Sequence, residues 1–302
     1  MFQLDDIASI RAFVRIAECG SFSIAAEKLH ITQPAISKRI AALENAISDK
    51  LFDRIGKKIL LTETGQTILP KCRAILYSIE DAEQSLQNLS GEVSGILRLG
   101  TSHHIGLHHL PPVIREFGQS YKSVELDLHF LSSEQVCQLV EKGELDLGII
   151  TLPPEIPEKL YAKTLWLDEM FAVTGWDHEL AKVDKPTLET LTHHNVLLPD
   201  VNTYTHKIID KLFSDNGLAL KTSLSTNYLQ TIKMMVSVGL GWSVLPRTII
   251  DQDLKVMEIA DFNVRRKLGY VQHARRTLPN AAIAMMGLLN KLSIQENIKN
   301  SV

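Results

Sequence analysis

The chain of 302 residues lacks long apolar runs, and it lacks the charge pattern of a secretion signal. No apolar stretch approaches the roughly 18–20 residues that a membrane-spanning helix needs. The N-terminus opens with acidic residues where a signal peptide would carry positive charge. We therefore expect a soluble, cytoplasmic protein.

Cysteine is scarce and forms no pattern. Cys19, Cys72 and Cys137 are an odd number, lie far apart and show no CxxC spacing. Neither a disulfide framework nor a cysteine-rich metal site is indicated, and we expect small apolar core residues. The chain also lacks GxSxG, Walker and GxGxxG motifs, which mark common hydrolases, nucleoside triphosphatases and dinucleotide enzymes. We expect no enzyme activity, no cofactor and no bound metal.

Charge is distributed unevenly, although the formal net charge is only -3. Residues 28–58 hold seven basic and three acidic residues, whereas residues 66–302 hold 23 basic and 27 acidic ones. A basic stretch on an otherwise acidic chain fits a polyanion, but it is equally typical of a solvated face. The 45% hydrophobic content is that of a globular protein, and the length indicates two or three domains.

Residues 1–65 show helical spacing of apolar side chains between frequent stop signals. One stripe ends at Gly20, and Ser23 is placed to cap a second, short helix. The first stripe is Leu4, Ile7, Ile10, Phe13, Val14 and Ile16, and the second is Ala25, Ala26 and Leu29. Two short helices in succession predict a tight helix pair.

A third helix is predicted after Thr32, which can cap it, with Pro34 in a first-turn position that needs no amide hydrogen. Its buried stripe is Ile36, Ile40, Leu43 and Ile47, and its exposed face carries Gln33, Ser37, Lys38 and Ala41. Polar and basic side chains at the start of such a helix can reach base edges or phosphates in a major groove.

Residues 50–62 contain two strand-like runs around a basic turn with a glycine. This pattern predicts a hairpin wing. The basic residues Arg54, Lys57 and Lys58 at its tip are placed to touch the DNA backbone or a neighbouring minor groove.

These residues together closely resemble the winged helix-turn-helix of the LysR-type transcriptional regulators. The matching segments are 25–29, 32–37, Ile40, 43–44, 51–52, Arg54 and 61–65. The family usually has Gly where this chain has Ser48, and a left-handed Ser there would cost about 1 kcal/mol. The resemblance implies DNA contacts by the third helix and the wing. The residues that we expect to contact DNA are Ser23, Thr32, Gln33, Pro34, Ser37, Lys38, Arg54, Lys57 and Lys58.

Residues 65–91 repeat apolar side chains at alternating steps of four and three. The seam is Ile68, Cys72, Ile75, Ile79, Ala82, Leu86 and Leu89. A stripe this narrow favours a two-stranded coiled coil, with packing on the chain's own domain as the alternative. The LysR resemblance likewise implies a linker helix that pairs two DNA-binding domains. We expect a DNA-binding domain at 1–64, a linker and dimerisation helix at 65–91 and an effector-binding domain at 92–302.

From Ile96 onward, strand-like and helix-like segments alternate, which predicts parallel strands with helical crossovers. Residues 143–149 and 238–246 carry a resemblance to the LysR-type effector domain. It implies two Rossmann-like α/β lobes with the fold of periplasmic solute-binding proteins, joined by crossovers near residues 163 and 268. Lobe I would then comprise 92–163 and 269–302, and lobe II would comprise 164–268.

Lobes of this kind bind ligands at the carboxyl ends of strands, where helix starts present free amides. The expected effector-binding residues at those ends are Thr101, Ser102, His103, Ser132, Ser133, Thr151, Asn202, Thr203 and Thr226. They include no arginine, so they fit a small carboxylate, an organic acid or an amino-acid-related one, held mainly by neutral donors and helix dipoles. Any single Ser or Thr can instead only cap its own helix, as Ser132 with Gln135 would in a capping box.

Four histidines crowd into seven positions, namely His103, His104, His108 and His109. His104 and His108 have the i,i+4 spacing of a helical metal site, but Gly106 and the following prolines predict a loop that becomes helical only near residue 110. No carboxylate follows before Glu116. Ligand contact, pH sensing and ordinary lobe packing remain open for these histidines.

We therefore expect a sequence-specific DNA-binding transcriptional regulator, an activator or a repressor, that is switched by a small metabolite bound between two lobes. A metal- or pH-sensing regulator that uses the histidine cluster is the alternative. The LysR resemblance implies a homotetramer on an interrupted palindrome of promoter DNA.

Overall fold

The computed structural model describes residues 6–55 and 58–299, with some side chains in these ranges left aside. The chain divides into two compact units, residues 1–89 and 90–302. Each unit has its own hydrophobic cores. In the described ranges, no helix has the combination of length and apolar character that crossing a bilayer requires.

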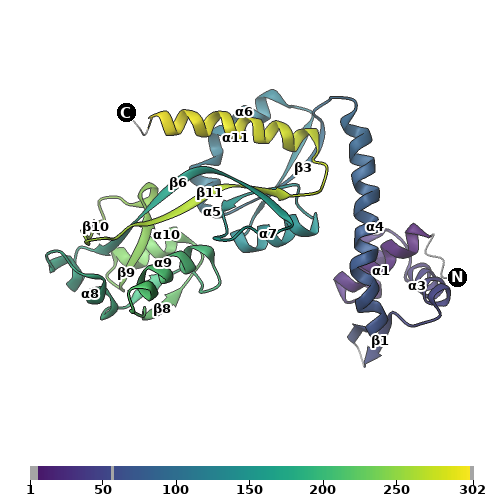
Figure 1. The fold of residues 1–302 in the computed structure, drawn as a ribbon, viewed down its shortest axis with the longest axis horizontal. Helices are drawn as coiled ribbons and strands as arrows, with labels where there is room; N and C mark the ends of the chain where they lie inside the picture. Colours follow the sequence, from purple (N-terminus) through teal and green to yellow (C-terminus); the bar gives the residue numbers. More distant parts are fainter. Residues whose placement is uncertain (1–5, 56–57, 300–302) are drawn as a thin grey trace. The chain divides into compact units, whose positions relative to one another are not determined.

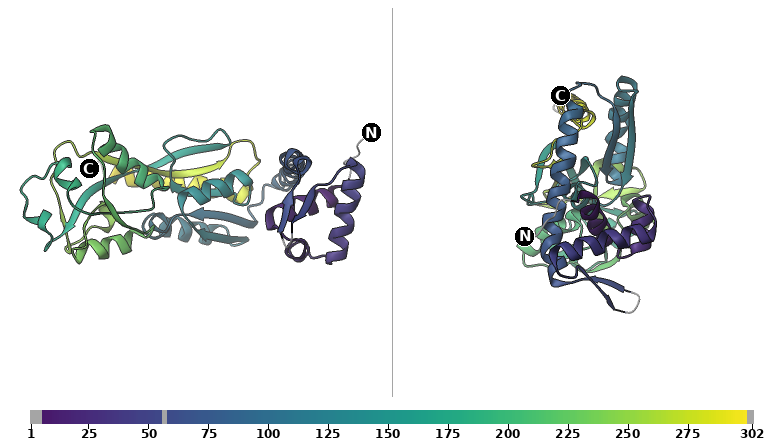
Figure 2. Two further views of the ribbon diagram at one scale, coloured as in Figure 1. Left: turned by 90° about the horizontal axis from the view of Figure 1, so that it is seen from below. Right: turned by 90° about the vertical axis from the view of Figure 1, so that its right-hand side faces the viewer.

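The first unit, here called the head, is a helical bundle with a two-stranded hairpin. Its elements are α1 (Ile7–Cys19), α2 (Phe22–Lys28), α3 (Gln33–Ile47), β1 (Phe52–Ile55), β2 (Lys58–Leu61) and α4 (Glu63–Asn88). The predicted stripes meet in one core, in which Ile10, Phe13, Ile16, Ile36 and Ile40 are buried. The antiparallel β1–β2 hairpin projects from the helices in the right-hand view of Figure 2. The winged helix-turn-helix expected from the sequence is confirmed.

Helix caps in the head follow the sequence with one exception. The Thr32 hydroxyl accepts the Ala35 amide at the start of α3, as expected. The prediction that Ser23 caps α2 is wrong, because Ser21 is the capping residue and its hydroxyl accepts the Ile24 amide. At the other end of α3, Ser48 adopts the left-handed conformation with φ of 56°, which favours glycine.

Helix α4 contributes to the head's core over its first half only. Of the predicted seam, Cys72 is buried against the head and Ile68 packs on the same core, so packing within the domain, the alternative to a coiled coil, holds for this part. Leu76, off the predicted seam, is buried there too, whereas Ile75 is exposed. Towards the C-terminal end, Leu86 and Leu89 are 69% and 82% exposed. The second half of the seam therefore remains open to solvent.

The second unit is built, over its described residues, on one nine-stranded mixed sheet. Its strands are β3 (Gly95–Thr101), β4 (Val124–Phe130), β5 (Leu147–Thr151), β6 (Leu160–Gly175), β7 (Val196–Leu198), β8 (Thr222–Ser225), β9 (Trp242–Pro246), β10 (Leu254–Val256) and β11 (Val264–His273). They pair in the order β4-β3-β5-β11-β6-β9-β7-β8, with β10 beside β6. Strands β3, β4 and β5 are parallel, as are β7, β8 and β9, which confirms the predicted alternation.

Helices cover both halves of this sheet. They are α5 (His103–His108), α6 (Leu110–Ser120), α7 (Ser133–Lys142), α8 (Leu188–Thr192), α9 (Tyr204–Asp215), α10 (Leu229–Ser237) and α11 (Asn280–Lys299), with short 3-10 turns η1 (Glu179–Lys182) and η2 (Arg247–Ile249). The Ser132–Gln135 capping box at α7 is present. The prediction of a loop before residue 110 is wrong, because residues 103–108 form α5, and Gly106 has room there only for a hydrogen beside the Phe130 ring.

The long strands β6 and β11 run side by side through two lobes (Figure 1). Lobe I denotes the part around β3, β4 and β5 with α5, α6, α7 and α11, and lobe II the part around β7, β8 and β9 with α8, α9 and α10. The pairing of β6 with β11 shifts register between Leu268 and Gly269. A Cβ at Gly269 would lie 2.0 Å from the Lys163 carbonyl oxygen, so only glycine permits this close strand crossing.

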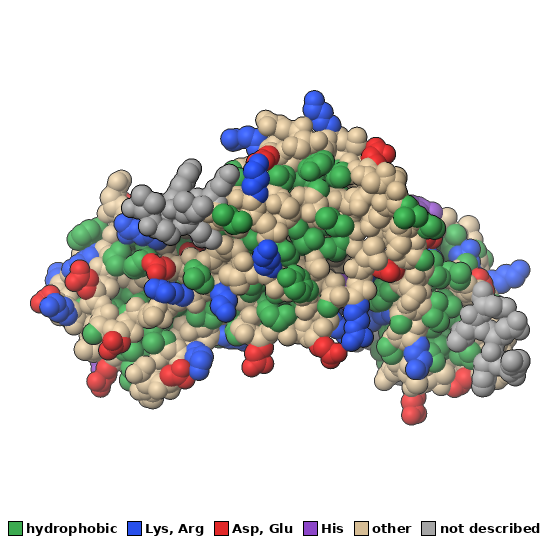
Figure 3. Space-filling model, turned by 45° about the horizontal axis from the view of Figure 1, so that its top comes forward, with side chains coloured by type: hydrophobic (Ala, Val, Ile, Leu, Met, Phe, Trp, Pro, Cys, Tyr) green, Lys and Arg blue, Asp and Glu red, His purple; other side chains and the backbone are tan. Residues whose placement is uncertain are grey.

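Basic and acidic side chains are interspersed with apolar ones over the face drawn in Figure 3. Among the described residues on this face, no large region carries a single sign of charge. Such a mixed surface gives no strong long-range steering of one class of ligand.

Candidate DNA-binding surface and effector pocket

Helix α3 presents a polar face to solvent at its N-terminal end. Gln33, Pro34 and Lys38 are exposed, Ser37 is half-buried, and Thr32 precedes them as an exposed cap. Their positions follow from the helix period, because Ile36, Ile40 and Leu43 occupy the opposite, buried face. The helix thus offers hydrogen-bonding and basic groups together on one side.

The start of α3 is tied to its neighbour helix and its end is tied to the wing. The exposed Ser23 hydroxyl on α2 lies 3.3 Å from Gln33 Oε1. At the far end, the buried carboxylate of Glu44 accepts the Leu51 amide at 3.0 Å and the Lys50 ammonium at 2.7 Å. Charge-assisted bonds of this kind fix α3 relative to β1.

Three wing residues expected to contact DNA are only partly accounted for. Arg54 lies in β1 and Lys58 lies in β2, in the hairpin ladder next to its tip. Lys57 lies outside the described residues. The hairpin itself is in place to carry these side chains.

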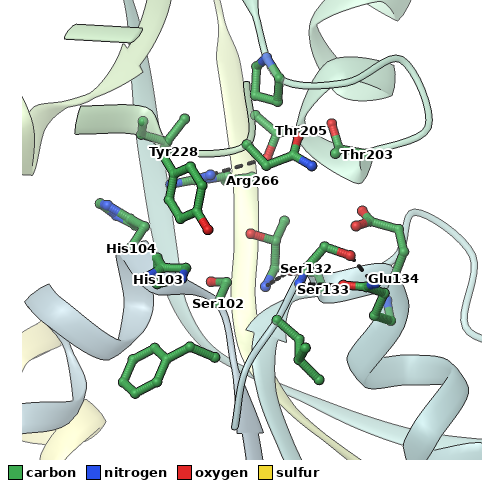
Figure 4. Close-up of a pocket in the computed structure, with 17 residues that line it drawn as sticks. Ser102, His103, His104, Ser132, Ser133, Glu134, Thr203, Thr205, Tyr228 and Arg266 are labelled. Atoms are coloured by element: carbon green, nitrogen blue, oxygen red, sulfur yellow. Dashed lines mark hydrogen bonds between the residues drawn. The ribbon is translucent and has the colours of Figure 1, made fainter. Parts of the chain in front are cut away.

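A cavity of about 380 Å³ lies between the two lobes, at the carboxyl ends of β3, β4 and β5 (Figure 4). This volume falls in the range of roughly 300–1,000 Å³ that is common for small-molecule sites. Six of the residues expected from the sequence line it, namely Ser102, His103, Ser132, Ser133, Thr151 and Thr203. The strand-end rule therefore brings residues from both lobes to one space.

Three other expected residues do not line the cavity. The Thr101 hydroxyl is fully buried and donates to the Ile149 carbonyl at 2.8 Å. The Asn202 side-chain amide donates to Asp200 at 2.9 Å. The Thr226 hydroxyl accepts the Tyr228 amide at 3.4 Å. Each of these polar groups forms a hydrogen bond with a neighbouring backbone or side-chain group instead, which is the ordinary role of such residues in turns.

Other polar lining residues were not expected from the sequence, among them Glu134, Thr205, Tyr228 and Arg266, whereas His104, for which ligand contact was left open, does line the cavity, as does Asn227 at a predicted strand end. Tyr228 follows that strand end by a few residues, and Glu134 lies inside the predicted capping box, so extending each predicted strand end by a few residues would have included both. Arg266 gives no such signal, because it stands in a basic run on β11 that reads as a solvated strand.

Arg266 is the buried cation of the cavity. Its Nε and Nη2 both lie 2.7 Å from Asp168 Oδ2, and its Nη1 donates to the Thr205 hydroxyl at 3.1 Å. The guanidinium and the carboxylate are 4% and 7% exposed. The cavity thus contains an arginine that the residues expected from the sequence did not include. Separating a buried pair of this type is costly, because either charge alone would be buried without a partner. The pair therefore holds its geometry firmly.

His104 packs beside this pair in its neutral form. Burial is the main cause that lowers its pKa to about 2, and the positive charge of Arg266 adds to the effect. Its Nε2 lies 3.7 Å from Asp168 Oδ2. Because the ring is uncharged near neutral pH, we do not count this approach as an ion pair. In the described part of the chain, no group of three or more His, Cys, Asp or Glu side chains is arranged to hold a metal ion.

The lobes touch along both flanks of the cavity. On one flank, Glu134 of α7 accepts the amide of Tyr204, the first residue of α9, at 2.6 Å. On the other flank, the His103 ring of α5 packs on the Tyr228 ring with centroids 4.8 Å apart, and His108 Nε2 lies 3.4 Å from the side-chain nitrogen of Gln230. These contacts bound the cavity on two sides.

Comparison with known protein families identifies both units. Residues 7–66 match the family described as bacterial regulatory helix-turn-helix protein, lysR family, and residues 90–293 match the LysR substrate binding domain. The chain belongs to the LysR family of transcriptional regulators. A LysR-family protein is a DNA-binding regulator with an effector-binding domain, not an enzyme.

Relatives of this LysR-family regulator agree along nearly the whole chain. A probable RuBisCO transcriptional regulator of Cyanophora paradoxa is 30% identical over 97% of this chain and 93% of its own length. The HTH-type transcriptional regulator YvbU of Bacillus subtilis is 32% identical over 87% of each chain. The structure of a full-length OxyR variant from Pseudomonas aeruginosa shares the fold, with a TM-score of 0.72, 22% identity and 95% coverage of both chains.

Proposed function

We propose that this LysR-family regulator is switched by a small carboxylate held in the cavity between lobes I and II. The observation that carries the proposal is a pair of hydroxyls, one from each lobe, that line the cavity and have no hydrogen-bond partner among the described residues. Ser102 precedes α5 and Tyr228 precedes α10, yet neither side chain caps its helix. Both labelled hydroxyls are directed towards the open space in Figure 4.

Arg266 adds hydrogen-bond donors that such a ligand can use, while Asp168 compensates its charge. A guanidinium has five N–H donors, and those of Arg266 serve Asp168 and Thr205 only in part. Its neighbour His104 is neutral and brings no competing charge. A carboxylate that reaches both hydroxyls would thus share the cavity with a guanidinium that Asp168 and Thr205 hold in place.

Switching follows from contacts with both lobes. A ligand that binds one arrangement of the lobes more tightly shifts the population towards it, by no more than its difference in affinity for the two arrangements. The proposed output is a change in how paired heads hold promoter DNA, with Gln33, Ser37 and Lys38 in the major groove and the wing beside it. A metal sensor is not favoured, because no group of three or more His, Cys, Asp or Glu side chains among the described residues is arranged to hold a metal ion. pH sensing through His104 is not favoured either, because a pKa of about 2 keeps it from titrating near neutral pH.

Pairing of the heads is proposed to use the open half of α4. Leu86 and Leu89 continue the heptad seam but are exposed in the single chain, and two copies of this stripe can bury each other. A dimer of such dimers would give the tetramer. Sedimentation velocity tests the pairing: Leu86→Glu should shift the protein towards monomer, whereas Leu167→Glu, similarly exposed on β6, should not.

Thermal unfolding of the full-length protein with a panel of small carboxylic acids tests the effector class. At least one acid should raise the Tm in a concentration-dependent way, because a ligand that binds only the folded state stabilises it. Ser102→Ala should reduce that shift, and Ser214→Ala, at the far end of α9, should leave it unchanged. A Tm that no carboxylate moves would contradict the proposal.

A further inference from the structure

Two ends of the cavity differ in charge. Figure 4 shows Ser102, His103 and Tyr228 at one end and Ser132, Glu134 and Thr203 at the other. Glu134 is the acidic residue among the cavity lining, and Arg266 is the basic one. Since Asp168 already compensates Arg266 at 2.7 Å, the carboxylate of Glu134 is the charge left over.

Glu134 uses little of its hydrogen-bonding capacity within the protein. An ionised carboxylate offers about four acceptor positions, and the described contacts of Glu134 amount to the single amide of Tyr204. No Lys, Arg or His of the described residues forms an ion pair with it. The starts of α7 and α9 add partial positive charge, but a helix dipole contributes less than a full cation and acts only over its first turn.

We propose that the effector is dipolar: its carboxylate lies at the Ser102 and Tyr228 end, and a protonated amine lies against Glu134. This assignment rests on the proposed function of the cavity and narrows the ligand class to amino-acid-like compounds. A purely anionic ligand would meet like charge at the Glu134 end, and a group without a donor there would leave a half-buried carboxylate with the Tyr204 amide as its one described donor.

With an amine at the Glu134 end, one molecule would contact both flanks of the cavity. Glu134 belongs to lobe I and caps α9 of lobe II, while Ser102 belongs to lobe I and Tyr228 to lobe II. A dipolar ligand therefore places its carboxylate against the Ser102 and Tyr228 hydroxyls and its amine against the Glu134 carboxylate. A charge-assisted hydrogen bond at a partly desolvated site is expected to change affinity about tenfold or more.

Matched ligand pairs test the assignment. Each standard L-amino acid is paired with the carboxylic acid that lacks its α-amino group, and acids with an amine at the far end of the chain are added. The dissociation constant of every pair is measured on the full-length protein by calorimetry or by the shift in Tm. The expected result is that the best ligand carries an amine and loses about tenfold or more in affinity without it.

Glu134→Gln isolates the charge. Gln keeps an oxygen that can accept the Tyr204 amide and removes the negative charge, so the preference for the amine should disappear while the deaminated partner binds equally well or better. Glu141→Gln, two turns further along α7, should keep the wild-type preference. Because each comparison is a ratio, a general loss of affinity in a variant cancels.

The outcomes separate this inference from the proposed function. If deaminated acids bind as well as amino acids, or if Glu134→Gln keeps the preference for the amine, the dipolar assignment is overturned and the carboxylate site stands. If neither member of any pair binds, both are overturned.

Discussion

The two recognition regions hold their polar side chains in opposite ways. On α3, Gln33 and Lys38 extend into solvent from a helix whose other face is core. In the cavity, Arg266, Ser133 and Thr205 are buried, and each is bonded to another part of the protein. The exposed surface suits a polyanion that is met by many weak, salt-sensitive contacts. The buried one suits a small ligand that needs fixed donors.

This difference predicts how mutations act. Side chains on the α3 face contribute little to folding, so their loss should change DNA binding alone. Cavity side chains carry bonds that stabilise the lobes, so most of their substitutions should change stability and ligand binding together. Residues whose groups have no partner in the protein, such as Ser102, should be the exceptions.

The largest effect is expected at the ion pair behind the cavity. Asp168→Ala leaves the buried Arg266 charge without a partner and should lower the free energy of unfolding by about 3–5 kcal/mol. Denaturant unfolding of the full chain measures this loss. The matched variant Glu158→Ala removes the partner of Arg275 in an ion pair whose two side chains are 80% and 90% exposed and should have no measurable effect. Equal losses in the two variants would contradict the comparison.

The stability of the protein measured over a pH series tests the burial of His104 beside this ion pair. Its folded pKa of about 2 lies below the usual value of 6.5, so protons bind preferentially to the unfolded chain. The stability that this histidine contributes is complete above pH 6.5 and falls by about 1.4 kcal/mol per pH unit below it. His104→Phe should flatten the acid limb of the stability curve. An unchanged limb would show that the ring is not held neutral.

Substitutions of two neighbouring hydroxyls at the end of β3 should distinguish a role in stability from a role in ligand binding. Thr101→Val removes the bond to the Ile149 carbonyl and should cost about 1–2 kcal/mol of stability with unchanged ligand affinity. Ser102→Ala removes a hydroxyl that caps no amide and should weaken the ligand about fivefold to tenfold with unchanged stability. Calorimetric titration and denaturant unfolding of both variants test this. A loss of ligand affinity in Thr101→Val together with a loss of stability in Ser102→Ala would contradict this prediction.

The smallest effect is expected on the head. Lys38→Ala and Arg54→Ala should each reduce the slope of log affinity against log salt concentration by about 1, through the loss of one phosphate contact. Fluorescence anisotropy on DNA upstream of the gene gives the slope. Lys211→Ala, on an exposed ion pair of α9, is the control. Slopes that match the wild type in all variants would contradict the proposed DNA contacts.

The head shows what local sequence signals can predict. Its stripes, the Thr32 cap and the hairpin depend on neighbours within a few residues, and the described residues show them, except that Ile7 of the first stripe is exposed and Leu4 lies outside the described residues. The cap at Ser23 failed because Ser21, slightly earlier in the chain, offers the same chemistry. The family resemblance rested on these local patterns, and the family comparison confirmed it.

The cavity shows where local signals end. Strand ends bring Ser102, Ser132 and Thr203 to one edge, a rule that needs only the order of strands and helices. Arg266 was missed because its burial depends on Asp168, 98 residues away, and on a pairing of β6 with β11 that no local pattern encodes. The sequence did not predict helix α5 because a glycine such as Gly106 usually interrupts a helix. In this structure Gly106 makes room for the Phe130 ring instead.

The central claim is that a carboxylate in this cavity changes how the regulator holds DNA. A footprint of the full-length protein on the DNA upstream of its gene, with and without the acid that raises its Tm most, tests it directly. The protected region or its affinity should change with the acid, and Ser102→Ala should need about fivefold to tenfold more acid for the same change. An acid that binds while the footprint stays identical would contradict the account.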